Sequence, residues 1–199
     1  MKGATKYRLI ASLAPVLCLL LLSSSCSNSL FKVKPAGELP ALPGTAARAD
    51  VGSLTFRAAP LLTDEETQEL FESNLQLAGL MPVRVEIVHN SGDAMDLRKL
   101  RFSLHDAANA NWKTISTRQA ISRILKANGV TLYNPEARRN FEKDFRAYEL
   151  ALNTPLTHAE GKRQGLVIFQ TAGKDSVASP RDLVLTIDGL GQPITLKLN

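Results

Sequence analysis

The chain has 199 residues, with 24 Lys and Arg against 19 Asp and Glu. Three of the cations precede residue 9, so the part from Ser27 onward carries 21 cations and 19 acids. A nucleic-acid-binding protein needs a clustered excess of cations to replace phosphate counterions, so we expect no nucleic-acid partner. A hydrophobic content of 44% excludes a chain that is disordered throughout.

The N-terminus has the order of a secretory signal peptide. A basic start is followed by a mostly apolar run of 14 residues from Leu9 to Leu22. Such a run is short for a ~30 Å hydrocarbon core, which takes about 20 residues to cross. The small residues 23–25 come next, as they do before a cleavage site. We therefore predict a signal peptide over residues 1–25.

The segment Leu-Leu-Ser-Ser-Ser-Cys, which ends at Cys26, resembles a bacterial lipobox. At a lipobox a prolipoprotein is cleaved before a Cys that carries diacylglycerol, so the resemblance implies lipidation of Cys26. One position departs from the usual pattern, because Ser23 lies three residues before the Cys, where a lipobox usually has Leu. Ser27 after the Cys implies passage to the outer membrane where the cell has one. The alternative is ordinary cleavage after a small residue, which would leave Cys26 as a free thiol.

The cysteine count favours lipidation. The only other cysteine, Cys18, lies in the segment to be removed, so the mature chain can form no internal disulfide. A lone exposed thiol is a liability in an oxidising compartment, and lipidation gives Cys26 a role. We therefore predict an exported protein that is anchored to the membrane of the cell envelope through its N-terminal lipid.

Residues 26–50 are predicted to comprise the lipidated Cys and a flexible tether. Proline, glycine and alanine interrupt any periodicity here, so the segment cannot bury enough apolar surface to offset its ordering entropy. A coil of 24 residues, 27–50, spans about 25–30 Å. That span would hold a domain clear of the lipid headgroups. Alternatively, the apolar and basic residues 30–34 could rest on the membrane surface.

From about Val51 short runs alternate between apolar and polar residues, a period typical of half-buried antiparallel strands. The first such run is 54–58. Thr63 and the acids behind it then form a capping box, which predicts a helix that ends near Gly79. Strands are expected next at 83–87 and 100–104, with a weaker one at 112–115.

Two helices are predicted as a block over residues 116–148, separated by a stop at Gly129. On the second helix Phe141, Phe145 and Tyr148 recur at positions i, i+4 and i+7. An aromatic stripe at this spacing is usually core. We therefore expect the three rings to be buried rather than to form a ligand site.

Beyond the helices the pattern returns to strands. A weak strand is expected at 150–153, and a central strand that is apolar on both faces is expected at 165–169. The runs 183–187 and 194–198 are separated by glycine and proline residues, which predicts a hairpin. The seven or eight strands in total fit a two-sheet antiparallel β-sandwich.

Residues 80–90 and 161–169 each join a strand rich in Val or Ile to Asn or Gly turn residues. On these features the domain, residues 51–199, resembles the immunoglobulin-like modules of exported bacterial lipoproteins, with a helical insertion at about 116–148. The resemblance implies an immunoglobulin-like β-sandwich. It also implies adhesion, scaffolding or ligand capture more often than catalysis, and the fold alone decides none of these.

Motifs for catalysis and metal binding are absent from the sequence, so we expect no catalytic residue, no metal and no cofactor. No glycine-rich phosphate loop, His-Glu-x-x-His or Gly-x-Ser-x-Gly occurs. The histidines are His89, His105 and His158. If the strands of the first two are hairpin neighbours, their rings lie about 20 Å apart and share no metal. His105 and Asp106 could form a base with an orienting carboxylate, but a solvated strand end is the favoured interpretation.

Two charged surfaces remain. The acids between Asp64 and Glu72 suggest a cation site, but the helix dipole and solubility explain acids in the first turns of a helix. On the second helix of the block, Arg139, Lys143 and Arg146 share one stripe. A solvated surface is the ordinary explanation. The sharper hypothesis is a basic face for an anionic envelope partner, whether protein, glycan or lipid headgroup.

Two functions therefore compete. The favoured one is a lipid-anchored envelope module that binds a partner or ligand without catalysis. The alternative is an envelope enzyme with an unrecognised acid/base site between the helical insertion and the sandwich. Polar side chains that converge in a concave pocket would favour the enzyme. The sequence leaves the identity of the partner and the oligomeric state open.

Overall fold

The computed structural model describes residues 31–108, 110–130, 134–178 and 180–199. The predicted signal peptide and Cys26 lie outside these residues. None of the helices in the described ranges combines the length and the apolar character that a membrane span requires.

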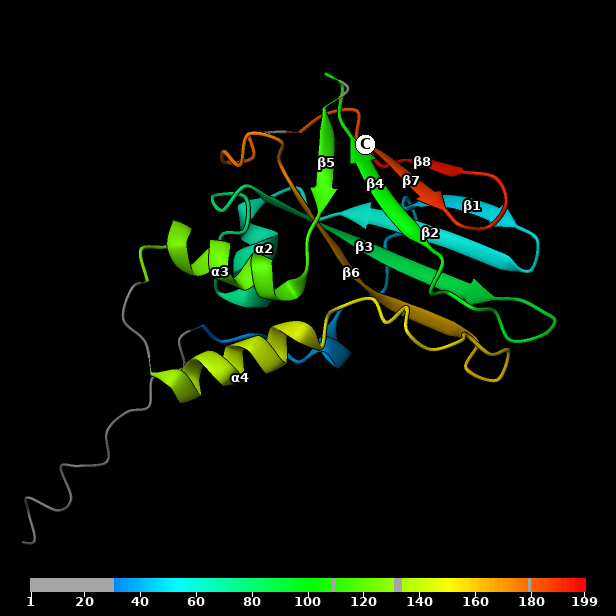
Figure 1. The fold of residues 1–199 in the computed structure, drawn as a ribbon, viewed down its shortest axis with the longest axis horizontal. Helices are drawn as coiled ribbons and strands as arrows, with labels where there is room; N and C mark the ends of the chain where they lie inside the picture. Colours follow the sequence, from blue (N-terminus) through cyan, green and yellow to red (C-terminus); the bar gives the residue numbers. More distant parts are fainter. Residues whose placement is uncertain (1–30, 109, 131–133, 179) are drawn as a thin grey trace, which may run out of the picture.

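The described residues form eight strands, and all of them belong to one antiparallel sheet. The strands are β1 (Ala47–Val51), β2 (Leu54–Pro60), β3 (Leu80–His89), β4 (Arg101–His105), β5 (Asn111–Thr114), β6 (Lys162–Gln170), β7 (Val184–Asp188) and β8 (Ile194–Lys197). Their order across the sheet is β1-β2-β3-β6-β5-β4-β7-β8. Because sheets twist and coil, the edge strands β1 and β8 approach one another, and the sheet is nearly closed into a barrel (Figure 1).

The prediction of a two-sheet, immunoglobulin-like β-sandwich is therefore wrong. Each strand is hydrogen-bonded to its neighbours in a single sheet, in which β6 pairs with β3 on one side and with β5 on the other. An alternating sequence shows that a strand has one buried face, and such a face can belong to a sandwich or to a curled sheet. The strand expected at 150–153 is also wrong, because these residues form no strand and the nearest pairing is a single bridge between Glu149 and Leu166.

The inside of the curled sheet is filled by every second residue of its strands. Val83 of β3 lies opposite Val167 of β6, and Met81 lies opposite Phe169. These four side chains are buried in one apolar core with residues of β2, β4, β5, β7 and β8. We call this core the barrel interior.

Three α-helices of the described residues lie together on one side of the sheet (Figure 1). They are α2 (Asp64–Phe71), α3 (Thr117–Ala127) and α4 (Pro135–Arg146), and a short 3-10 helix, η1 (Ala36–Glu38), precedes the first strand. Their apolar faces pack on Leu80, Leu166 and Ile168, which point outward from β3 and β6. The helices and these residues form a second core, the helical layer. The predicted burial of β6 on both faces is thus confirmed.

The helix ends follow the capping rules. The Thr63 hydroxyl accepts a hydrogen bond from the N–H of Glu66, and the Glu66 carboxylate accepts one from the N–H of Thr63. The predicted capping box is therefore confirmed. Ser116 and Gln119 form the same arrangement at the start of α3, and Asn134 caps α4.

Residues 31–46 lie along the helical layer and the sheet. The Lys34 N–H donates to the carbonyl of Leu70 at 2.9 Å, and the Tyr148 hydroxyl donates to the carbonyl of Lys34 at 2.8 Å. Further along, the Arg57 guanidinium donates to the Pro43 carbonyl at 2.9 Å. The described part of the predicted tether thus lies against the domain, and its last residues form β1.

Candidate functional site

A recess lies between the helical layer and the sheet, at a fork where β5 and β6 separate. β5 pairs with β6 at two positions before the chain leaves for α3. In the fork, the segment that follows α4 crosses β6, and the Leu166 N–H donates to the Tyr148 carbonyl at 2.6 Å. Gly165 permits this crossing, because a Cβ there would lie 2.6 Å from backbone atoms of Leu150.

The recess encloses about 540 Å³ of empty space, its open mouth included. Its lining is largely apolar. The lining residues are Phe102, Thr114, Ile115, Thr117, Phe145, Tyr148, Glu149, Leu150, Leu152, Leu166, Val167 and Ile168. Glu149 is the one carboxylate in this lining.

Two of the polar groups in the recess already have hydrogen-bond partners. The Thr114 hydroxyl donates to the Phe102 carbonyl at 2.8 Å, and the Tyr148 hydroxyl is bound to Lys34. Burial, and to a smaller extent Glu38, raises the pKa of Tyr148, so the phenol stays a neutral donor. An acid/base site here would have one carboxylate in apolar surroundings. The recess is therefore better suited to bind a small apolar ligand group than to catalyse proton transfer.

The predicted basic stripe lies on the outward face of α4. Phe141, Phe145 and Tyr148 point inward and are 2%, 1% and 2% exposed, which confirms the predicted aromatic core. Arg139, Lys143 and Arg146 are exposed and line a shallow depression together with Glu142 and Ala147. Across the described ranges, no ion pair includes any of these three cations. The neighbouring pair of Arg138 with Glu142 forms as predicted, at 2.8 Å.

The assumed hairpin between the strands of His89 and His105 is wrong, because β3 pairs with β2 and β6. His89 instead points into the barrel interior, where it is 2% exposed and neither ring nitrogen has a hydrogen-bond partner. The His158 ring lies edge-on to it, with 6.0 Å between the centroids. No third ligand joins them: in the part of the chain that the structure describes, no three His, Cys, Asp or Glu are grouped to hold a metal.

The proposed pairing of His105 with Asp106 does not form. The Asp106 carboxylate accepts hydrogen bonds from Trp112 Nε1, Ala108 N–H and Ala110 N–H, each at 3.0 Å. Burial alone would raise the pKa of Asp106, but these hydrogen bonds outweigh it and hold the pKa below its usual value. Asp106 is a turn residue between β4 and β5.

Three of the acids in α2 and at its C-terminal end have structural partners. Glu66 belongs to the capping box, Glu69 pairs with Lys34 at 2.7 Å, and Glu72 accepts from the Lys32 N–H at 3.0 Å. These contacts join α2 to its own N-terminus and to the segment before η1.

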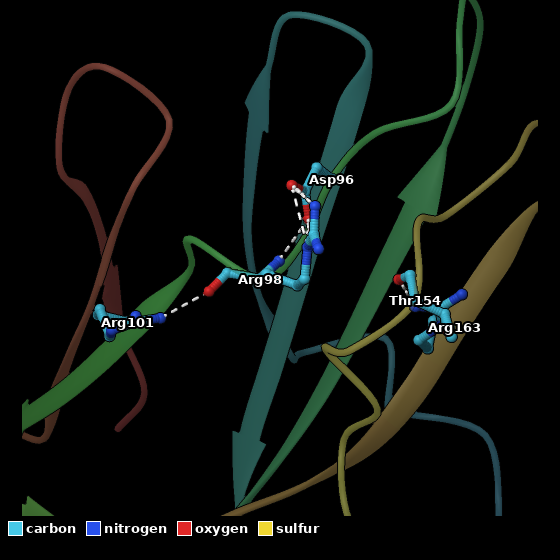
Figure 2. A network of polar contacts seen from close by, with 5 residues as sticks. All are labelled: Asp96, Arg98, Arg101, Thr154 and Arg163. Carbon is cyan, nitrogen blue, oxygen red and sulfur yellow. Dashed lines mark hydrogen bonds and ion pairs between the residues drawn. The ribbon is translucent and has the colours of Figure 1, made fainter.

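One polar cluster at the end of the barrel was missed by the sequence analysis. Arg163 of β6 is 9% exposed, and its guanidinium donates to the carbonyls of Ala151, Thr154 and Pro155 and to Glu160. Figure 2 shows Arg163 reaching Thr154, with Asp96, Arg98 and Arg101 in a separate surface network. The sequence did hold a signal for the burial of Arg163. It lies an even number of residues from Val167 and Phe169, so all three side chains point to the inner face of the sheet. Each nitrogen of the Arg163 guanidinium thus has an acceptor within the fold.

No protein-family model, curated protein or solved structure matches this chain. Its function therefore has to be inferred from its own residues.

Proposed function

We propose that this chain is an exported lipoprotein, anchored at Cys26 to a membrane of the cell envelope. Its barrel domain is an interaction module without catalytic activity, and it binds an anionic partner through the basic face of α4, Arg139, Lys143 and Arg146. The observation that carries this proposal is the exposure, on one helix face, of three cations that take part in no ion pair with any described residue.

The position of these cations follows from helix geometry. α4 must bury Phe141 and Phe145, and positions two residues away point to the opposite side of a helix. Folding therefore holds Arg139 and Lys143 away from the core and uses neither charge. Among the residues that the structure describes, no ion pair engages these cations, so an anionic group can approach them without breaking one.

The recess supports a module over an enzyme. Its lining supplies apolar side chains, one carboxylate and hydroxyls that are largely engaged. General acid/base catalysis needs a positioned pair of titratable groups within reach of a substrate. The lining offers Glu149 and a phenol that donates to the Lys34 backbone.

The anchoring is tested by replacing Cys26 with Ser in the full chain and by fractionating cells that express it. We expect the variant to leave the membrane fraction, and we expect only the wild type to incorporate a labelled fatty acid. If the variant stays in the membrane fraction, the anchor lies elsewhere.

The binding face is tested by the triple variant R139E/K143E/R146E, incubated with native envelopes at low salt. We expect its melting temperature to match that of the wild type, because exposed substitutions change stability by about 0.5 kcal/mol or less. We expect it to retain less envelope material. A matched control reverses three other exposed cations, K99E/K113E/K197E. Equal retention by both variants and the wild type would make the face a solvated surface.

A further inference from the structure

The described part of the chain begins beside α4. Phe31 packs edge-on against Phe141 of α4, with 5.3 Å between the ring centroids. On the other side, Lys32 and Lys34 are hydrogen-bonded to α2 through Glu72 and the Leu70 carbonyl. The segment 31–34 is thus bound between the two helices, and in Figure 1 it lies next to α4.

This attachment shortens the connection between the domain and the predicted lipid. Cys26 precedes Phe31 by five residues, which span at most about 18 Å when fully extended. A free coil over 27–50 would allow a far larger separation. If Cys26 is lipidated, the α4 side of the domain is held next to the bilayer.

We propose that the basic face of α4 docks on the anionic lipid headgroups of the membrane that holds the anchor. This inference rests on the proposed anchoring at Cys26. A helix with its side chains is about 10–12 Å across, so the outward face of α4 lies within one helix diameter of the point where the chain leaves the domain. The tether brings the cations to the surface, and no second attachment site is required.

The charges of the neighbouring helices select this orientation. α4 also carries Glu136, Glu142 and Asp144, and Glu142 is paired with Arg138. The acids of α2 and of its C-cap are Asp64, Glu65, Glu66, Glu69 and Glu72. They lie across the segment 31–34 from α4. An anionic surface repels α2 and attracts the basic face, so the domain lies with α4 toward the lipid and with α2 turned away.

The membrane is favoured over a protein or a glycan because of this continuity with the anchor. Each cation near an anionic leaflet strengthens binding by roughly fivefold, and the effect is lost within a Debye length. The short connection therefore keeps a lipid surface within reach of the basic face at all times. A soluble partner would have to compete with it.

The test uses the full lipidated chain, reconstituted in vesicles of phosphatidylcholine alone or mixed with phosphatidylglycerol. An environment-sensitive fluorophore is attached at one introduced cysteine in each of three variants. The positions, all exposed, are Ala147→Cys directly after α4, Gln68→Cys on α2 and Ser91→Cys in the loop after β3. Lipids with a nitroxide on the headgroup then quench a label that lies near the surface. Flotation of the vesicles reports anchoring separately.

We expect the Ala147→Cys label to be quenched several-fold more than the other two in phosphatidylglycerol vesicles. High salt and R139E/K143E/R146E should abolish the difference, whereas K99E/K113E/K197E should preserve it. Equal quenching at the three positions in floated vesicles would overturn the docking inference and leave the anchoring intact. Failure of the wild type to float would overturn the anchoring itself. Docking that needs added envelope protein or glycan would replace the lipid as the partner.

Discussion

The barrel interior and the helical layer are two apolar cores that share the strands β3 and β6, yet they are assembled over different distances along the chain. In the barrel interior Leu54 of β2 and Leu196 of β8 belong to one cluster. In the helical layer the rings of Phe141, Phe145 and Tyr148 come from one helix and its last turn. Non-local pairs thus close the barrel, and local periodicity builds much of the layer.

The two regions also treat charge differently. On the outer surface of the sheet, Glu86 is buried between Arg57 at 3.0 Å and Lys162 at 3.6 Å. On α4 the cations of the basic face have no such partner among the described ion pairs. Around Glu86 the charges of the sheet are thus paired within the fold, whereas the basic face of α4 presents cations that are available for contact.

Phe145→Ala gives the largest expected effect and tests whether the helical layer is a true core. Removal of this fully buried ring should lower the free energy of unfolding by about 3–5 kcal/mol. Urea unfolding of the purified chain measures it. The matched control is Leu77→Ala, since Leu77 is 51% exposed and should change stability by about 0.5 kcal/mol or less. Equal effects of the two substitutions would mean that the layer is not packed.

Arg163→Met tests the closed end of the barrel. The substitution leaves Glu160 and the carbonyls of Ala151, Thr154 and Pro155 without their donor. We expect a loss of about 2–4 kcal/mol, because removing one partner of a buried polar cluster strands the others. Arg101→Met is the control, since Arg101 is exposed and donates to nearby backbone carbonyls. If Arg163→Met lowers the free energy of unfolding no more than the control does, the cluster does not stabilise the fold.

Gly165→Ala tests the point where the two cores meet. A methyl group there would lie 2.6 Å from the Leu150 backbone, so the crossing segment has to shift. We expect destabilisation of about 1–3 kcal/mol, as for other overpacked sites. Gly44→Ala is a suitable control, because nothing lies within 4 Å of a Cβ at that position. Equal stability of the two variants would show that the fork is loosely packed.

The sequence predicted what depends on neighbours along the chain. The capping box at Thr63 and the buried stripe of α4 follow from spacing within one helix, and both are confirmed. The curled sheet could not be predicted, since alternation does not say which strands are partners. The burial of His89 could not be predicted either, because it depends on residues of the distant loop 150–161. The basic stripe of α4 was predicted, but the contact of the N-terminal segment with the same helix, through Phe31 and Phe141, required the structure.

The smallest expected effect concerns acid stability at the end of the barrel. Arg98 lowers the pKa of Asp96 to about 2, through side-chain hydrogen bonds and a backbone N–H (Figure 2). The ordinary value for the unfolded chain is about 3.9. Because the folded-state pKa is the lower one, the ionised carboxylate stabilises the fold above pH 4, and this contribution is lost as the pH falls from about 4 to about 2. Asp96→Asn should therefore lower the melting temperature slightly at neutral pH and match the wild type near pH 2. Because the pair is exposed, salt should shrink the difference. A difference that stays constant over the titration would show that Asp96 acts through its shape rather than its charge.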